Sequence, residues 1–239
     1  MPVTPRDSTA GEILNNIGLR QAASLPERVY ETLEQSIVDG ILRPEVHLVE
    51  DDLARQLGVS RNPVRQALQR LAHEGFVRRE PGRGAFVHSP SEQEIDDIFH
   101  VRALLEGDCA RLAADRITAL GLEELSRILA LGKAAVQVED ARELLELNDR
   151  FHGVIISAAN NPIMERLMIG LRRRIRWYFS SVVVTRATGS WQQHEEIFLA
   201  LAARDGAKCA ALMAVHVGQT LEKIQGKQQV AAFSPARLK

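Results

Sequence analysis

The sequence predicts a mainly α-helical protein, with an N-terminal winged helix-turn-helix and a C-terminal antiparallel bundle of about six helices. Apolar residues recur every three or four positions in three short segments up to Gly75, which is typical of amphipathic helices. The pattern changes to two short strand-like runs between residues 76 and 88, and from Ser91 onward it is helical again. A length of 239 residues favours two domains over one.

The small domain begins with a helix that opens at Pro26 and stops at Gly40. Its apolar stripe consists of Val29, Leu33 and Ile37. Residues 1–24 are rich in Pro, Thr, Ser, Asn and Gly and show no sustained period, which predicts a flexible N-terminal arm.

Two more helices and a hairpin complete this domain, which we place at residues 25–90. A short second helix ending at Gly58 is predicted from Leu48, Leu53 and Leu57. Ser60 is a good N-cap for the third helix, and Gly75 closes it. The inward-facing residues of the third helix are Val64, Leu68 and Leu71. The segments FVRRE, PGRG and AFVH then predict two strands joined by a tight turn.

The second domain, residues 91–225, is predicted to be entirely helical, and residues 226–239 to be a flexible tail. The expected helices are 92–115, 121–137, 141–159, 161–184, 190–203 and 206–225. The breaks between them are predicted at Gly121, Asn160-Asn161-Pro162, Thr188-Gly189 and Asp205-Gly206. Because no strands intervene, an antiparallel bundle is expected.

Composition indicates an ordinary soluble protein, with 45% hydrophobic and 26% charged residues. The apolar runs are far shorter than the roughly 18 residues that span a bilayer, and no secretory signal opens the chain. Cys109 and Cys209 form no CxxC pair, so a disulfide framework is not expected. These observations predict a cytoplasmic location and no membrane partner.

Charge is unevenly distributed along the chain. Between Leu53 and His88 there are seven arginines against two glutamates, whereas the rest of the chain carries 23 basic and 29 acidic residues. A basic segment on an acidic body suggests a polyanionic partner for that segment alone. The simpler alternative is a solvated charged surface.

The third helix has the residue types that read base edges in DNA. Because its apolar stripe faces inward, Arg61 and Arg65 share the outward side with Asn62, Gln66 and Gln69. Arginine can donate two hydrogen bonds to guanine, and asparagine or glutamine can pair with adenine in the same way. The hairpin adds Arg78, Arg79 and Arg83, with Gly82 and Gly84 allowing close approach to a phosphate or the minor groove. A winged helix used only for protein contacts is the alternative.

The stretch from Leu25 to Val87, centred on GVSRNPVRQALQRLAHEGFVRREPGRGAFV, closely resembles the DNA-binding domain of the GntR family of bacterial transcription regulators. The resemblance implies a double-stranded DNA operator as partner. The contacts that we assign are Ser60, Arg61, Asn62, Arg65, Gln66, Arg83 and Gly84. Two positions depart from the family pattern: the usual Pro-Gly after the first helix is Pro44-Glu45, and Asp51 replaces an arginine that contacts DNA in some members.

Four polar residues interrupt apolar stripes in the bundle. Asn148 and His152 lie one turn apart on one stripe, and His194 and His216 each lie on another. His194 precedes Asp205 by 11 residues and His216 follows it by 11, so an antiparallel hairpin turning there brings both to one level, roughly 16 Å from the turn. Three imidazoles and one oxygen suit a divalent transition metal. The alternative is three separately satisfied core histidines.

Residues 92–222 resemble the all-helical FadR C-terminal (FCD) domain of one GntR subfamily, in its shorter, VanR-like branch. This resemblance implies a metal ion (zinc, nickel or manganese) held by Asn148, His152, His194 and His216, and a small organic acid as effector. An asparagine where the family often has aspartate removes one negative charge.

A charge also interrupts the first stripe of the bundle, at Arg102. A buried guanidinium needs an anion. Either Arg102 forms a structural ion pair with a carboxylate such as Glu106, or it binds the effector's carboxylate beside the metal, and the resemblance favours the second interpretation. The arginines at 172, 173, 174 and 176 are predicted to form a solvated helix face, from which one could reach the cavity.

Together these features predict a DNA-binding transcription regulator, a homodimeric repressor whose operator affinity is controlled by a small carboxylate at the metal site. A regulator for which the ion itself is the signal is the alternative. A metalloenzyme is less favoured, since the sequence shows no general base beside the ligands, no nucleophile elbow and no phosphate loop.

Overall fold

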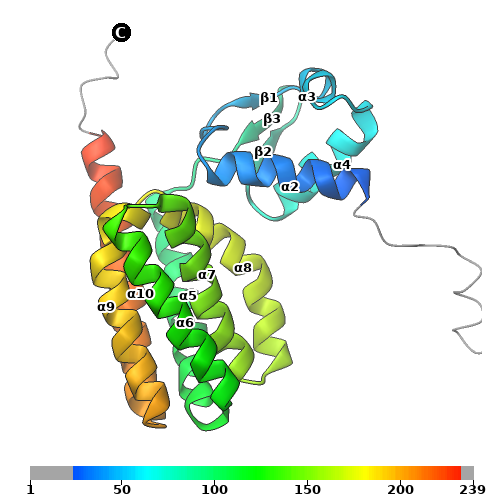
Figure 1. Cartoon of the computed structure of the whole chain (residues 1–239). Coiled ribbons are helices and arrows are strands. Elements are labelled where there is room, and N and C mark those ends of the chain that lie inside the picture. Colours follow the sequence, from blue (N-terminus) through cyan, green and yellow to red (C-terminus); the bar gives the residue numbers. More distant parts are fainter. Residues whose placement is uncertain (1–23, 233–239) are drawn as a thin grey trace, which may run out of the picture.

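The computed structural model describes residues 24–232, with side chains to residue 226. The predicted N-terminal arm (1–24), apart from Ser24, and residues 233–239 of the predicted tail (226–239) lie outside the described residues. The predicted fold class is confirmed: a winged helix-turn-helix lies against one end of a helical bundle (Figure 1). The elements of the small domain are α2 (Leu25–Val38), β1 (His47–Leu48), α3 (Glu50–Leu57), α4 (Arg61–His73), β2 (Val77–Glu80) and β3 (Gly84–Val87).

The core of the small domain forms from the predicted stripes. Val29, Leu33 and Ile37 of α2 are buried, as are Val64, Leu68 and Leu71 of α4. Ser24 caps α2 by accepting a hydrogen bond from the backbone N–H of Glu27. Ser60 occupies the N-cap position of α4 as predicted, but its side chain makes no capping hydrogen bond.

The sheet contains a strand that the sequence did not predict. The predicted hairpin is present as β2 and β3, and β1 pairs antiparallel with β3 to give the order β1-β3-β2. Placing Leu48 on a helical stripe was wrong: it lies in β1 opposite Ala85, and α3 begins at Glu50. A strand of two residues is too short to show a period of two in the sequence.

The bundle consists of α5 (Glu92–Arg116), α6 (Ala119–Gln137), α7 (Ala141–Ala158), α8 (Pro162–Ser180), α9 (Val183–Ala202) and α10 (Gly206–Ala232). Helix α10 packs along α5, α9 packs on α10 and α6, and α7 contacts α5, α6, α8 and α9 (Figure 1). The metal-ligand candidates therefore lie on helices that meet in the interior. Within residues 24–232 no helix is both long and apolar enough to cross a bilayer.

Several predicted helix boundaries were wrong. The break at Thr188-Gly189 does not exist, because α9 passes through both residues and the chain turns at Ser181-Val182 instead. Gly121 does not interrupt α6 either, since Thr118 caps that helix and Gly121 lies in its first turn. Helix α10 continues to Ala232, seven residues beyond its expected end. A single glycine inside a helix lowers stability only modestly, so it is a weak stop signal.

Candidate metal centre and recognition surface

Three histidines from three helices meet inside the bundle. His152 lies on α7, His194 on α9 and His216 on α10, and all three are buried. One ring nitrogen of each lies within 4.8 Å of the others. The Nε2 atoms of His194 and His216 are 3.3 Å apart. The structure thus brings together the three imidazoles that the sequence singled out.

The α9–α10 turn sets the level at which two of these histidines meet. Asp205 starts α10 by accepting a hydrogen bond from the backbone N–H of Lys208 at 2.9 Å, so the helices run back from this point. The ring of His194 stacks on Phe151 of α7, with 4.1 Å between the ring centroids. Trp191 packs edge-on against His194, and the pair of aromatic rings fixes the orientation of the imidazole.

Side-chain oxygens lie close to Nδ1 of two of the three rings. His152 Nδ1 lies 2.7 Å from a carboxylate oxygen of Glu106, and His216 Nδ1 lies 3.1 Å from Gln193 Oε1. Because an amide oxygen only accepts, Nδ1 of His216 carries the proton, and its Nε2 is left with a lone pair 3.3 Å from Nε2 of His194. Nε2 of His152 accepts from Nη2 of Arg102 at 3.3 Å, whereas its Nδ1 lies close to Glu106 without hydrogen-bond geometry. A carboxylate or carbonyl behind a ligating histidine is the usual arrangement in metal sites.

His194 has one nitrogen that no described residue satisfies. Its Nδ1 is buried without a hydrogen-bond partner. Burial, followed by nearby positive charge, holds the pKa of both His194 and His216 well below its usual range, so both imidazoles are neutral at ordinary pH. Neutral imidazoles with inward lone pairs are the chemical form that a divalent transition metal requires. The donor set therefore fits such an ion.

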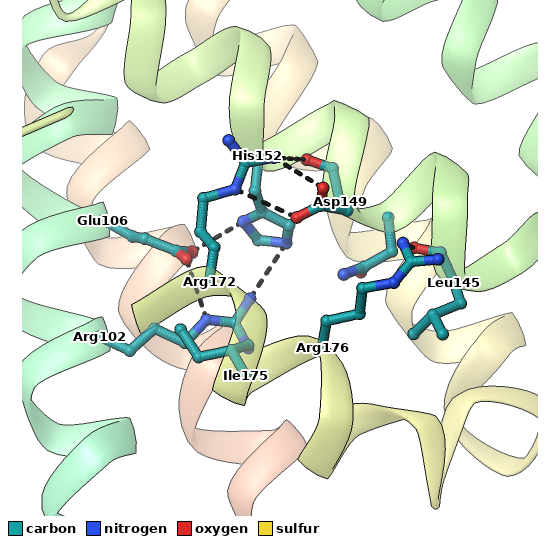
Figure 2. A pocket seen from close by; sticks show the side chains of 9 residues that line it. Arg102, Glu106, Leu145, Asp149, His152, Arg172, Ile175 and Arg176 are labelled. Atoms are coloured by element: carbon teal, nitrogen blue, oxygen red, sulfur yellow. Dashed lines mark hydrogen bonds and ion pairs between the residues drawn. The ribbon is translucent and has the colours of Figure 1, made fainter. Parts of the chain in front are cut away.

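Asn148 lies one helical turn before His152 on α7, and it is buried. Both residues line a small cavity together with Arg102 and Glu106, and Arg172 and Arg176 of α8 lie across from them (Figure 2). The cavity volume is about 10 Å³, which is roughly the space that one water molecule needs.

Arg102 is neutralised within the protein. Its Nε donates to Glu106 at 3.0 Å, both side chains are only 2% exposed, and its Nη2 lies 3.3 Å from His152 Nε2. Burial alone would raise the pKa of Glu106, but the charges of Arg102 and His152 lower it to about 2. The structure therefore shows the ion pair that the sequence left as one of two interpretations. Glu106 also orients His152, a role that sequence spacing did not reveal.

The arginines at 172, 173, 174 and 176 of α8 do not form a solvated face, which corrects the sequence prediction. Arg172 bonds Asp149 at 2.8 Å and Arg176 bonds Glu146 at 3.2 Å, and both line the cavity. Their neighbours face the winged helix: Arg173 donates to Tyr30 of α2, and Arg174 donates to Glu94 at the start of α5. Helix α8 therefore connects the cavity with the small domain.

The predicted recognition residues lie on the exposed side of α4. Arg61, Asn62, Arg65 and Gln66 are all exposed, whereas Val64 is fully buried. Arg65 donates to Asn62 at 3.0 Å. Arg61 pairs with Asp51 at 2.9 Å, so the residue that departs from the family pattern holds a recognition arginine directly.

The wing is shaped by residues in the left-handed backbone region. Gly84 has φ +99°, and a Cβ there would lie 2.8 Å from His47 Nε2, so a larger residue would be strained. Arg83 is exposed at the wing tip and pairs with Glu80 at 2.6 Å. Glu45, where the family has glycine, has φ +69° and pairs with Arg78 at 3.0 Å.

Comparisons with known proteins agree with this architecture. The model of the bacterial regulatory proteins of the gntR family matches residues 25–87, and the FCD domain model matches residues 97–219. The transcriptional repressor RspR of Escherichia coli K12 is 28% identical, over 85% of this chain and 90% of its own. The gluconate operon repressor of Bacillus subtilis 168 is 30% identical, over 86% and 85%. The structure of E. coli McbR/YncC superposes with a TM-score of 0.75 at 24% identity, over 87% of this chain and all of its own.

Proposed function

The chain belongs to the gntR family of bacterial regulatory proteins and carries an FCD domain, and we propose that it is a repressor whose operator affinity is controlled by a small carboxylate bound at a metal ion. It is a DNA-binding transcription regulator, and its relatives are regulators, not enzymes. The observation that carries the proposal is the buried cluster of three imidazoles, each offering a nitrogen within 4.8 Å of the others.

DNA recognition in this proposal uses α4 and the wing. Arg61 and Arg65, with Asn62 and Gln66, enter the major groove, while Ser60 and the wing at Arg83 and Gly84 contact the backbone and the minor groove. Two copies of the chain would bind a pseudo-palindromic operator as a homodimer, since paired half-sites mirror twofold symmetry. Such a regulator works in the cytoplasm, where operator DNA is found.

In the metal site, His152, His194 and His216 would hold the ion through nitrogen and Asn148 through its side-chain oxygen. Zinc, nickel and manganese all suit this set. When bound, the ion would supply positive charge and an open coordination position for a carboxylate oxygen. Gln193 accepts from Nδ1 of His216 and so favours its ligating tautomer, and a carboxylate oxygen of Glu106 lies 2.7 Å from Nδ1 of His152.

Helix α8 is the proposed route from the cavity to the DNA-binding domain. Arg172 and Arg176 line the cavity, and Arg173 on the same helix bonds Tyr30, whose hydroxyl donates to Glu74 at 2.5 Å. Glu74 is the C-cap of α4, the recognition helix. A ligand that shifts α8 would therefore change the contact at the C-terminal end of α4. Thermodynamic linkage requires the ligand to bind more tightly to one position of the DNA-binding domain than to the other.

The test is operator release. Labelled duplexes selected from a random library are titrated with metal-loaded protein, and acetate, succinate, citrate and gluconate are then added; gluconate is included because one relative is named for a gluconate operon. We expect one acid to weaken operator binding, roughly 5–150-fold, and chelation to abolish that response. Release by metal alone would favour the ion as signal. No response to any acid or metal would contradict the proposal.

A further inference from the structure

The bundle contains a second buried arginine, and unlike Arg102 it has no acidic partner among the side chains that the structure describes. Arg186 of α9 is only 4% exposed. Its Nη2 donates to the side-chain oxygens of Gln193 and Gln219, the latter at 3.5 Å. Among the described residues no carboxylate lies within ion-pair distance, and Glu222 on the exposed side of α10 is the one acidic group that acts on it from farther away.

The uncompensated charge has an energetic consequence. Taking a guanidinium out of water is costly unless an anion replaces the lost solvation, and two neutral amides replace only part of it. Burial accordingly lowers the pKa of Arg186 below its ordinary value. The Nε atom of Arg186 is buried and has no hydrogen-bond partner among the described residues.

Two further unpartnered polar atoms follow Arg186 along α9. Ser190, one turn on, is 2% exposed, and its hydroxyl has no hydrogen-bond partner among the described residues. His194, another turn on, has the orphaned Nδ1. Residues four apart lie on one face of a helix, so these groups form a row that ends at the histidine cluster.

Gly189 explains how the guanidinium fits. A Cβ on this residue would lie 2.6 Å from Nη1 of Arg186, so the missing side chain gives the guanidinium its place against the helix. Gly189, which the sequence analysis interpreted as a helix break, thus leaves room for the Arg186 side chain inside a continuous helix. Gln193 links the same arginine to the cluster, since its Oε1 accepts from both Arg186 and His216.

We propose that Arg186 and Ser190 form an anion site beside the histidine cluster and bind the carboxylate of the effector. The site deepens the proposed function and rests on it. Arginine Nε and a hydroxyl are donors that match carboxylate oxygens, and the bound anion would neutralise a buried cation that has no anionic partner among the described residues. Arg102, the anchor expected from the sequence, is already paired with Glu106.

The first test concerns the free protein. Because Arg186→Gln removes an uncompensated buried charge, we expect it to keep the fold and to raise the melting temperature of the full chain, by about 2–4 °C for each kcal/mol of stability gained. The matched control is Arg166→Gln, an exposed arginine on α8, which should leave the melting temperature unchanged. A marked fall in melting temperature for Arg186→Gln would overturn the proposal, since it would show that the arginine is satisfied within the protein.

The second test measures acid binding by thermal shift, with zinc-loaded protein and acetate, succinate, citrate and gluconate as probes at constant ionic strength. Arg186→Gln should lower the affinity for the acid that stabilises the wild type at least about tenfold. Ser190→Ala and Gly189→Ala should lower that affinity less, and all three variants should keep the zinc content of the wild type. An unaltered affinity in Arg186→Gln, with wild-type protein responding, would overturn the anion site alone. No shift of the wild type by any acid would contradict the anion site and effector control together.

Discussion

At the scale of single residues, the partner of a buried charge distinguishes side chains that stabilise the fold from side chains that are available to bind a ligand. Arg102 and Arg186 are both buried arginines, but among the described residues a carboxylate lies beside the first and not beside the second. Spacing along the chain predicted that three histidines would meet. His194 and His216 are equally far from the turn at Asp205, so they lie at the same height along two antiparallel helices, and His152 faces them from a third helix. Spacing did not place Glu106 beside His152 or Gln193 beside His216, because those contacts depend on how the helices pack sideways.

Arg65 is the residue at which DNA reading is most directly tested. Its side chain is exposed on α4 and bonds only Asn62 among the described residues, so it is available to a base edge. We expect Arg65→Ala to lose about 1–3 kcal/mol of operator binding at one base position. Binding is measured against duplexes with every single-base change, and Arg127→Ala on the bundle surface serves as the control. A uniform loss across all duplexes would show a phosphate contact instead.

Asp51 is expected to restrain its recognition arginine. Its carboxylate pairs with Arg61 at 2.9 Å and adds negative charge where the DNA backbone approaches. Asp51→Ala should therefore strengthen operator binding by several-fold at low salt, and the gain should shrink as salt screens the interaction. Asp108→Ala, on the bundle, is the matched control. Weaker operator binding in Asp51→Ala would mean that the pair positions Arg61 productively.

At the scale of elements, long helices and their apolar faces were predictable, whereas short or context-dependent features were not. The strand β1 has two residues and depends on β3 for its hydrogen bonds. Gly189 suggested a break because glycine is a poor helix former, but packing of α9 against α6 and α10 overrides that preference. The arginines at 172, 173, 174 and 176 of α8 suggested a solvated face, although they have partners on α2, α5 and α7.

Helix α8 should couple the two domains through Arg173. Arg173→Gln removes its bond to Tyr30 but leaves the cavity residues in place. We expect acid affinity to stay within about twofold of wild type, while the operator release that the acid causes falls to under about threefold. Arg166→Gln on the same helix should behave as wild type. Full operator release in Arg173→Gln would remove α8 from the coupling route.

At the scale of the whole molecule, we expect the contact between the two domains around Glu74 to depend on pH. Glu74 accepts from Tyr30 and lies near Arg70 and Arg173. Burial alone would raise its pKa, but the hydrogen bonds and these charges lower it from its ordinary value of 4.5. The ionised form is therefore favoured by folding, and its contribution is present above pH 4.5 and is lost as the pH falls through the lower folded pKa.

A comparison of wild type with Glu74→Gln tests whether ionised Glu74 stabilises the folded protein. The variant should unfold more readily at pH 7, and the difference in unfolding free energy should narrow as the pH falls below 4.5. Denaturant unfolding at several pH values measures it. If the difference in unfolding free energy stayed constant over that pH range, ionisation of Glu74 would not stabilise the contact between the domains.

The account depends most on the buried histidines holding a metal ion, and the metal content of the protein tests that claim most directly. Purified protein is incubated with zinc, dialysed, and analysed for metal per chain by mass spectrometry, with His194→Ala and the exposed-histidine control His100→Ala treated alike. The account predicts roughly one ion per chain in wild type and in His100→Ala, and a large loss in His194→Ala. Equal metal content in wild type and His194→Ala, or none in wild type, would contradict it.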